Sequence, residues 1–232
     1  MALEKNVISF SVFGTNPKYT VGLIRNLQLA RVYYPDWFIF IFTDLTPGKD
    51  ILTRCMEFPR VSIFDMRTMR LPGMFWRFLA PAVDDEVIRV IVRDTDSRPN
   101  QREVDAVADW MNEGTTLHIM RDHPHHNSKI MGGMWGFKIS THFSLIEALE
   151  KYPVPQDRDV RYVDQYFLTE MVYNNCVSNS TVHASFNRFE RHAKDFPSRR
   201  NYDYFVGEIF EYDDSRPHLQ RDAELLTSGQ AG

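Results

Sequence analysis

The sequence has few cysteines and no long apolar run, and each shortage excludes a class of protein. Cys55 and Cys176 are the only cysteines among 232 residues. They are too few for a disulfide framework, and their neighbours lack the paired spacing of a zinc site. The strongest apolar runs, 37–42 and 87–92, are far shorter than the roughly 20 residues that span a bilayer. We therefore expect no membrane span and a reducing, cytoplasmic location.

A strong excess of charge is also missing. The formal net charge is -4 at pH 7, so the chain as a whole offers no reason to bind a polyanion such as a nucleic acid. Residues 1–6 include charged side chains where a secretory signal needs an apolar stretch of roughly 7 to 15 residues. We expect no nucleic-acid partner, and any phosphate-binding site has to be local.

What the chain does have is enough apolar material for one sizeable core. Hydrophobic residues make up 43% of the 232 positions, which suits a single domain better than two small ones. We expect that domain to cover residues 1–226. Residues 227–232 have the composition of a linker, of the kind that leads to further domains in longer proteins.

Apolar segments followed by turn signals alternate with stretches of helical periodicity. This alternation predicts an α/β protein with a Rossmann-like, mostly parallel central sheet flanked by helices. Residues 122–133 are expected to form a loop over one face of the sheet, and residues 182–183 and 205–207 to form short strands or loop anchors. The predicted strands are 7–14, 37–42, 61–64, 86–92 and 117–120, and the predicted helices are 19–34, 74–79, 102–111, 143–151 and 162–173.

The first candidate site is a pair of carboxylates directly after the strand at 86–92. Asp94 and Asp96 are one residue apart on an extended segment, so their side chains point the same way. In an open α/β sheet, ligands bind beyond the carboxyl ends of the strands. Oxygen ligands of this kind suit Mn2+ or Mg2+, which can also bind the phosphate oxygens of a substrate. The alternative interpretation is a capped turn ahead of Pro99.

A second catalytic interpretation is a haloacid-dehalogenase-like phosphatase, in which one carboxylate of a similar pair is the nucleophile. That nucleophile normally follows the first strand of the fold, whereas about three predicted strands come before Asp94 here. Ser97 and Arg98 also stand where the Gly-Thr pair of such enzymes is found. Both features favour the metal-site interpretation.

The run Asp94-Thr95-Asp96 resembles the DxD motif of GT-A nucleotide-diphospho-sugar glycosyltransferases. Residues 118–124 (HIMRDHP) and 131–136 (MGGMWG) are similar to those of a glycosyltransferase family found in bacterial surface-polysaccharide systems and large DNA viruses, including chlorella-virus capsid glycosylation proteins. The resemblance covers most of the chain, with later matches at Asp164-Gln165, His183 and Phe205-Val206-Gly207.

The resemblance implies a binding site for the nucleotide part of a donor. Phe13, Gly14, Thr15 and Tyr19 match the region that receives base and ribose, although core packing is an equal interpretation for Phe13. Asp44 ends the second strand and is a further candidate, with a turn as its alternative. The remaining candidates are Arg77, which the resemblance places near the phosphates or the carboxylates of the site, and the motif residues Asp94 and Thr95.

The resemblance also implies catalytic and metal-binding residues. Asp164 matches an aspartate that faces the reacting sugar, where it would act as general base or position the donor. Asp122, at a strand end, is a competing general base. His183 matches a late histidine that completes the metal shell beside Asp94 and Asp96, and His192 is its substitute.

Two further groups of residues are weaker candidates. The spacing of His123, His125 and His126 suits neither a helical pair nor a structural zinc site. We therefore expect their loop to cover the donor, with Asp122 or His123 in contact with hydroxyl groups of the sugar. Trp135 comes shortly after two glycines. It either presents a flat apolar surface to a sugar or packs in the core. A basic stretch, comprising Lys194, Arg199 and Arg200, is a candidate diphosphate clamp or a solvated surface.

Together these residues predict a metal-dependent transfer of a sugar from a nucleotide-diphosphate sugar to a glycan or glycoprotein acceptor. UDP is the commonest donor nucleotide in this fold class, and GDP and dTDP remain open. The alternatives are the phosphatase and a noncatalytic module that binds nucleotide sugars or glycans.

Overall fold

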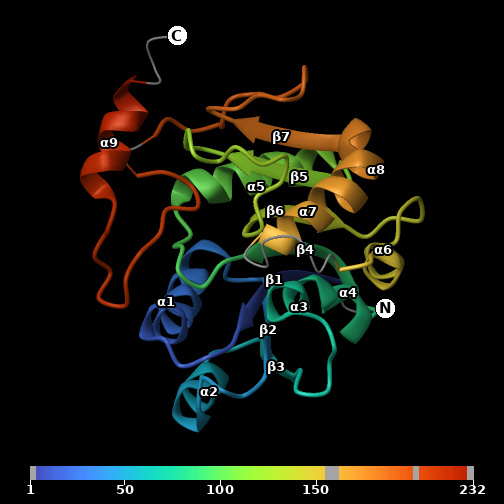
Figure 1. Ribbon diagram of the computed structural model, residues 1–232, viewed down its shortest axis with the longest axis vertical. Coiled ribbons are helices and arrows are strands. Elements are labelled where there is room, and N and C mark those ends of the chain that lie inside the picture. Colours follow the sequence, from blue (N-terminus) through green and yellow to red (C-terminus); the bar gives the residue numbers. More distant parts are fainter. Residues whose placement is uncertain (1–3, 155–161, 201–203, 229–232) are drawn as a thin grey trace.

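The computed structural model describes residues 4–154, 162–200 and 204–228. Its centre is a 7-stranded sheet with the order β3-β2-β1-β4-β6-β5-β7 (Figure 1). Only β6 runs antiparallel to its neighbours, and the remaining pairs are parallel. The strands are β1 (Lys5–Val12), β2 (Phe38–Thr43), β3 (Val61–Asp65), β4 (Val87–Arg93), β5 (Leu117–Arg121), β6 (Met134–Lys138) and β7 (Ser180–Ala184).

Helices cover both faces of the sheet. On one face, α1 (Pro17–Tyr33), α2 (Lys49–Met56) and α5 (Gln101–Glu113) enclose an apolar cluster with the side chains of β1, β2 and β4. A larger cluster fills the other face. The helices of that face are α3 (Gly73–Trp76), α4 (Ala80–Val83), α6 (Leu145–Lys151), α7 (Val163–Phe167) and α8 (Asn174–Cys176). A 3-10 turn (Arg77–Leu79) joins α3 to α4, and a π-helical turn (Leu168–Tyr173) joins α7 to α8.

Local sequence signals fix the ends of the two longest helices. α1 begins after Asn16, whose side chain accepts a hydrogen bond from the Lys18 backbone N–H, and Pro17 occupies the first turn. α5 begins after Asn100, which caps the Glu103 N–H, and ends at Gly114 in the left-handed conformation. The two N-caps therefore mark where the loops that follow β1 and β4 end, at the same edge of the sheet.

The α/β prediction with a mostly parallel sheet is confirmed, and the predicted strands and helices lie within a few residues of the observed ones. Among the elements that escaped prediction are β6 and α9 (Leu219–Ser228), and Figure 1 shows α9 on the side of the molecule opposite α6 and α8. Residues 205–207 form a loop anchor rather than a strand. Of the predicted linker-like tail, Thr227 and Ser228 belong to α9, and 229–232 lie outside the described residues.

Among the described residues, no helix is long and apolar enough to cross a membrane.

Candidate active site

The chain order places a ligand site at the carboxyl ends of β1 and β4. From β1 the chain moves outward to β2 and β3, and it then returns to add β4 on the other side of β1. Loops diverge at such a switch point and leave a crevice beyond the strand ends. A cleft of about 570 Å³ opens there, and both Phe13 after β1 and the Asp94–Asp96 segment after β4 line it.

The two carboxylates of the predicted motif face this cleft. The Asp94 side chain is 46% exposed and that of Asp96 is 13% exposed. Burial, followed by repulsion from Asp94, raises the pKa of Asp96 above its ordinary value, although Lys18 lies 3.3 Å from its Oδ2 and opposes the shift. Two crowded carboxylates whose charge is hard to accommodate form a site that favours a cation.

These donors fit a divalent cation that takes its other ligands from substrate and water. Mg2+ and Mn2+ are commonly held by one or two carboxylates together with phosphate oxygens. Within residues 4–154, 162–200 and 204–228, no group of three or more His, Cys, Asp or Glu side chains is placed to hold a metal ion. Asp94 and Asp96 would therefore supply two protein ligands and leave most positions to the substrate.

Arg77 links the motif to the second predicted carboxylate. It pairs with Asp94 through Nη1 and with Asp164 through Nη2, the latter at 2.9 Å. Its guanidinium is buried, and the hydroxyls of Ser9 and Ser11 hold its backbone carbonyl and N–H at 2.6 and 2.9 Å. Arg77 therefore lies beside the carboxylates of the cleft and bridges two of them.

Asp164 lies in the first turn of α7 and lines the same cleft as Asp94 and Asp96. The residue is 4% exposed, and its Oδ1 accepts the backbone N–H of Gln165 at 2.8 Å. Burial, together with repulsion from Asp94, raises the pKa of Asp164 above its ordinary value, although Arg77 opposes the shift. A carboxyl group with a raised pKa beside a substrate cleft has the environment of a proton acceptor or of a sugar-positioning residue.

Two glycines at the start of β6 let these carboxylates approach. Because β6 is antiparallel to β4, its first residues lie at the carboxyl end of β4 and form part of the cleft. A Cβ atom on Gly133 would overlap the Asp94 carboxylate, and one on Gly132 would come within 2.5 Å of Asp164 Oδ2. Any side chain at either position would displace the site.

Helix α1 supports the motif from behind. A Cβ on Gly22 would overlap the Thr95 carbonyl, so helix and motif touch directly. Asn26, which is 2% exposed, donates to the same carbonyl at 3.0 Å. Thr95 itself is buried and also lines the cleft. Its carbonyl fixes the backbone between the two aspartates.

At the β1 end of the cleft, the structure brings together only part of the predicted nucleotide site. Phe13 and Tyr19 line the cleft and are 43% and 40% exposed. Gly14 and Thr15 form the exposed connection between them and are absent from the described lining. Asp44 shapes a turn: it accepts the Thr46 N–H at 3.0 Å, and the Thr46 hydroxyl accepts the Gly14 N–H at 2.6 Å. Its alternative interpretation as a turn residue fits these contacts.

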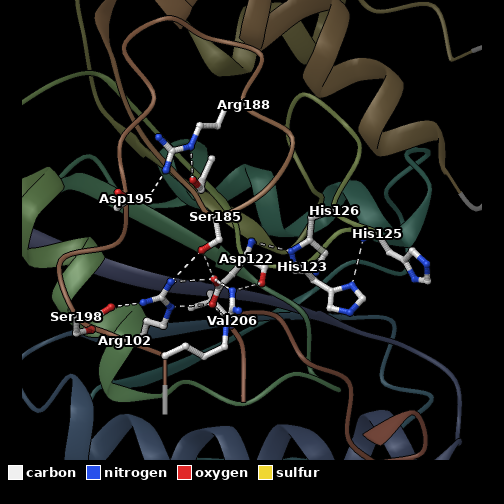
Figure 2. Close-up of polar contacts among 12 residues, drawn as sticks. Arg102, Asp122, His123, His125, His126, Ser185, Arg188, Asp195, Ser198 and Val206 are labelled. Carbon is white, nitrogen blue, oxygen red and sulfur yellow. Dashed lines mark hydrogen bonds and ion pairs between the residues drawn. The ribbon is translucent and has the colours of Figure 1, made fainter. Parts of the chain in front are cut away.

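Asp122, the competing general base, is surrounded by donors and is fully buried (Figure 2). It pairs with Arg102 and Arg200, and it accepts the Ser185 hydroxyl at 2.6 Å and the Val206 N–H at 3.0 Å. Burial pushes its pKa up, but the hydrogen bonds and charges of the two arginines outweigh that effect and leave the pKa lowered. A stabilised carboxylate outside the cleft lining is a poor base, so Asp122 has a structural role.

His183 is also held away from the aspartate pair. Its two ring nitrogens contact His118 at 2.9 Å and Asp109 at 3.0 Å, and its side chain is completely buried. Neither His183 nor its substitute His192, which contacts Ser180, is among the described residues that line the cleft. The structure therefore does not bring a third metal ligand to Asp94 and Asp96 from this part of the chain.

Trp135 and the basic stretch also lie away from the aspartate pair. Trp135 is fully buried and packs edge-on against Phe78 at 5.3 Å, which makes it a core residue. Lys194 pairs with Asp109 and Glu113, and Arg200 with Asp122, while Arg199 lines a separate cavity. The described part of the basic stretch does not face the aspartate pair.

Sequence reasoning missed residues on two sides of the cleft. Lys18, in the first turn of α1, is a cation beside Asp96 that no sequence pattern singled out. At the far end, the predicted loop residues His123, His125 and His126 line the cleft, and Asp222 of α9 joins them. Asp222 had no signal in the sequence, because α9 itself was not predicted.

Comparison with solved structures places this architecture among known folds. Residues 1–349 of S. aureus TarS match with a TM-score of 0.53 and 12% identity over 83% of this chain and 59% of that one. A galactosyltransferase, LgtC, in complex with donor and acceptor sugar analogs matches with a TM-score of 0.44 and 10% identity, covering 96% and 95%. The chain thus has the GT-A fold of glycosyltransferases, and it spans about three fifths of the TarS structure. No family model and no curated protein sequence matches it.

Proposed function

We propose that this protein is a glycosyltransferase that moves a sugar from a nucleotide-diphosphate sugar to a hydroxyl group of a glycan or glycoprotein. The observation that carries the proposal is the convergence of Asp94, Asp96 and Asp164 on one cleft at the switch point of a GT-A sheet. A nucleotide on Phe13 and Tyr19 would direct its diphosphate toward the end of β4.

Four residues of the cleft have a direct role in the proposed reaction. Phe13 and Tyr19 offer exposed aromatic surface to the base and ribose. Arg77 holds Asp94 and Asp164 in fixed positions and supplies positive charge near the departing diphosphate. Asp164 positions the transferred sugar or accepts the proton of the attacking hydroxyl.

Asp94 and Asp96 would hold Mn2+ or Mg2+. The ion would supply Lewis-acid stabilisation of the leaving nucleoside diphosphate. Lys18 balances the charge of Asp96 before substrate binds, since it lies 3.3 Å from that carboxylate. UDP is the proposed nucleotide, with GDP and dTDP as the alternatives.

Turnover tests the proposal. Purified protein is incubated with UDP, GDP and dTDP sugars and a mixture of simple glycosides, with and without Mn2+, and release of nucleoside diphosphate is measured. We expect Mn2+-dependent release from one nucleotide class, reduced about 100-fold or more by Asp96→Asn. Asp85→Asn, a matched change at an exposed aspartate outside the cleft lining, should leave release unchanged.

Two results would replace the proposal by one of its alternatives. Release of phosphate from simple phosphoesters, lost in Asp94→Asn, would favour the phosphatase. Tight binding of a nucleotide sugar without turnover would favour a noncatalytic binding module.

A further inference from the structure

The end of the cleft away from β1 has an unusual set of polar side chains. His123 and His126 follow β5, and Asp222 comes from α9, nearly a hundred residues later in the chain. They are 1%, 7% and 4% exposed, and all three line the cleft that contains Asp94. We call these three residues the imidazole wall.

Backbone contacts fix the tautomers of the two histidines. The Asp122 N–H donates to His126 Nδ1 at 3.1 Å, and the His125 N–H donates to His123 Nδ1 at 3.2 Å (Figure 2). A ring nitrogen that accepts a hydrogen bond carries no proton, so a neutral ring carries its proton on Nε2. Burial lowers the pKa of His123 to about 4 and that of His126 to about 3. Each ring is therefore uncharged at neutral pH and offers one Nε2–H donor.

Neither donor is satisfied within the described part of the chain. His123 Nε2 is buried without a hydrogen-bond partner, and the Oδ1 atom of Asp222 lies 3.6 Å away. No described residue makes a hydrogen bond to His126 Nε2. Within the described ranges, Asp222 Oδ1 accepts hydrogen bonds from the neighbouring Arg221 at 3.0 and 3.1 Å. Since buried polar groups are nearly always paired, the unpartnered His123 Nε2–H at the cleft indicates a ligand.

The wall is held in place by the Asp122 network. The Val206 N–H that donates to Asp122 fixes the adjacent Phe205, whose ring stacks on His123 with a centroid distance of 4.5 Å. Asn187 donates to the carbonyls of Pro124 and His126 at 2.8 and 3.0 Å and fixes the loop. The donors are thus oriented before any ligand arrives, which lowers the cost of binding.

Strand order separates the wall from the site of the diphosphate. β5, which leads into His123, is two strands from β4, which leads into Asp94. At the usual spacing of neighbouring strands, the two strand ends are roughly 10 Å apart. A donor whose diphosphate lies at Asp94 would have its sugar near Asp164, so the wall faces the group beyond that sugar.

We propose that the imidazole wall is the acceptor subsite and that it binds an uncharged, hydroxyl-bearing sugar. This inference rests on the proposed function. A hydroxyl group both donates and accepts, and it matches neutral Nε2–H donors set beside a carboxylate. Among the described residues of the wall, both imidazoles are neutral and Asp222 already pairs with Arg221 at 3.0 Å. An anionic sugar therefore meets no unpaired positive charge there, which selects against uronic acids.

The test is binding of methyl glycosides, measured by saturation-transfer NMR with Mg2+ and saturating nucleoside diphosphate. The probes are methyl glucoside, galactoside, mannoside and rhamnoside, with methyl glucuronide as the charged comparison. His126→Asn keeps an oxygen acceptor for the Asp122 N–H and removes the Nε2–H donor, and Asp222→Asn removes the negative charge at nearly constant shape. His142→Asn, at an exposed histidine outside the cleft lining, is the matched control.

We expect a neutral glycoside to bind more tightly than the glucuronide, and each wall variant to raise its Kd about 3- to 10-fold. Nucleotide affinity should stay within about twofold of wild type, because the wall does not touch the nucleotide. The control should match wild type in both measurements.

Several outcomes would overturn the inference: no neutral glycoside binding, preference for the glucuronide, or variants that weaken the nucleotide sugar and leave the glycoside unaffected. A wild type that binds no nucleotide would contradict the proposed function alone. Its glycoside titration, run without nucleotide, would then decide for or against the wall through the same variants.

Discussion

Arg77 is the residue at which the charges of the cleft meet. It lies between Asp94 and Asp164, and the side chains of Arg77 and Asp164 are 8% and 6% exposed. A pair this deeply buried gains little net stability over an apolar substitute, but removing one partner leaves an uncompensated charge. Arg77 is therefore an obligatory partner of both carboxylates.

Replacement of Arg77 by methionine should destabilise the protein by about 3 kcal/mol, mainly through the stranded Asp164 carboxylate. Urea unfolding of the variant and of wild type measures the difference. The double variant Arg77→Met, Asp164→Asn should recover part of the loss, because the second change removes the unpaired charge. A loss below about 0.5 kcal/mol in the single variant would show that the buried pair is not formed.

At the scale of elements, α1 is the part of the scaffold that fixes the motif. Asn26 donates to the Thr95 carbonyl, which lies between the two aspartates. Asn26→Ala should weaken Mn2+-dependent nucleotide binding about 10-fold while the cleft side chains stay the same, because one unsatisfied carbonyl releases the turn. Calorimetric titration measures the affinity. The control is Asn175→Ala, which removes a comparable hydrogen bond from a side chain to the backbone at an exposed position of α8. Equal nucleotide affinities in the two variants would contradict a supporting role for α1.

Element by element, the sequence predicts what periodicity and turn signals can express. β1, β2 and β4 are rich in β-branched and aromatic apolar residues, and the aspartate pair follows β4, so both the sheet and the motif could be located. β6 is five residues long and follows two glycines, so its pattern resembles a loop. α9 has too few apolar positions to be distinguished from surface sequence.

The failures at the site have the same origin. The family resemblance made His183 a candidate ligand, and its place at a strand end made Asp122 a candidate base. Long-range contacts with Asp109, Arg102 and Val206 decide the environments of these two side chains. The wall residue Asp222 depends on how α9 packs against a loop nearly a hundred residues earlier, which periodicity does not encode.

For the whole molecule, buried histidines link stability to pH. Burial lowers the pKa of His118, His123, His126 and His183, to about 4 for His123 and about 3 for His126. Below the ordinary histidine pKa of about 6.5, the unfolded chain takes up protons that the folded chain does not. Stability should therefore fall as pH decreases from about 6.5 toward 4, by at most about 1.4 kcal/mol per pH unit for each histidine.

Urea unfolding at pH 7, 6 and 5 measures this dependence. The raised pKa values of Asp96 and Asp164 act in the opposite direction, since those groups bind protons more readily when folded. Four histidines should outweigh two carboxyl groups. Constant or increasing stability down to pH 5 would contradict the assignment of these rings as buried and neutral.

The central claim is that Asp94 and Asp96 form a cation-dependent site for a nucleotide-diphosphate sugar. Calorimetric titration of UDP, GDP and dTDP sugars, with and without Mn2+, tests it most directly. We predict that one nucleotide class binds, that affinity falls about 10-fold or more without Mn2+, and that Asp96→Ala abolishes the Mn2+ effect. Binding that is indifferent to both Mn2+ and Asp96, or no binding of any donor, would contradict it.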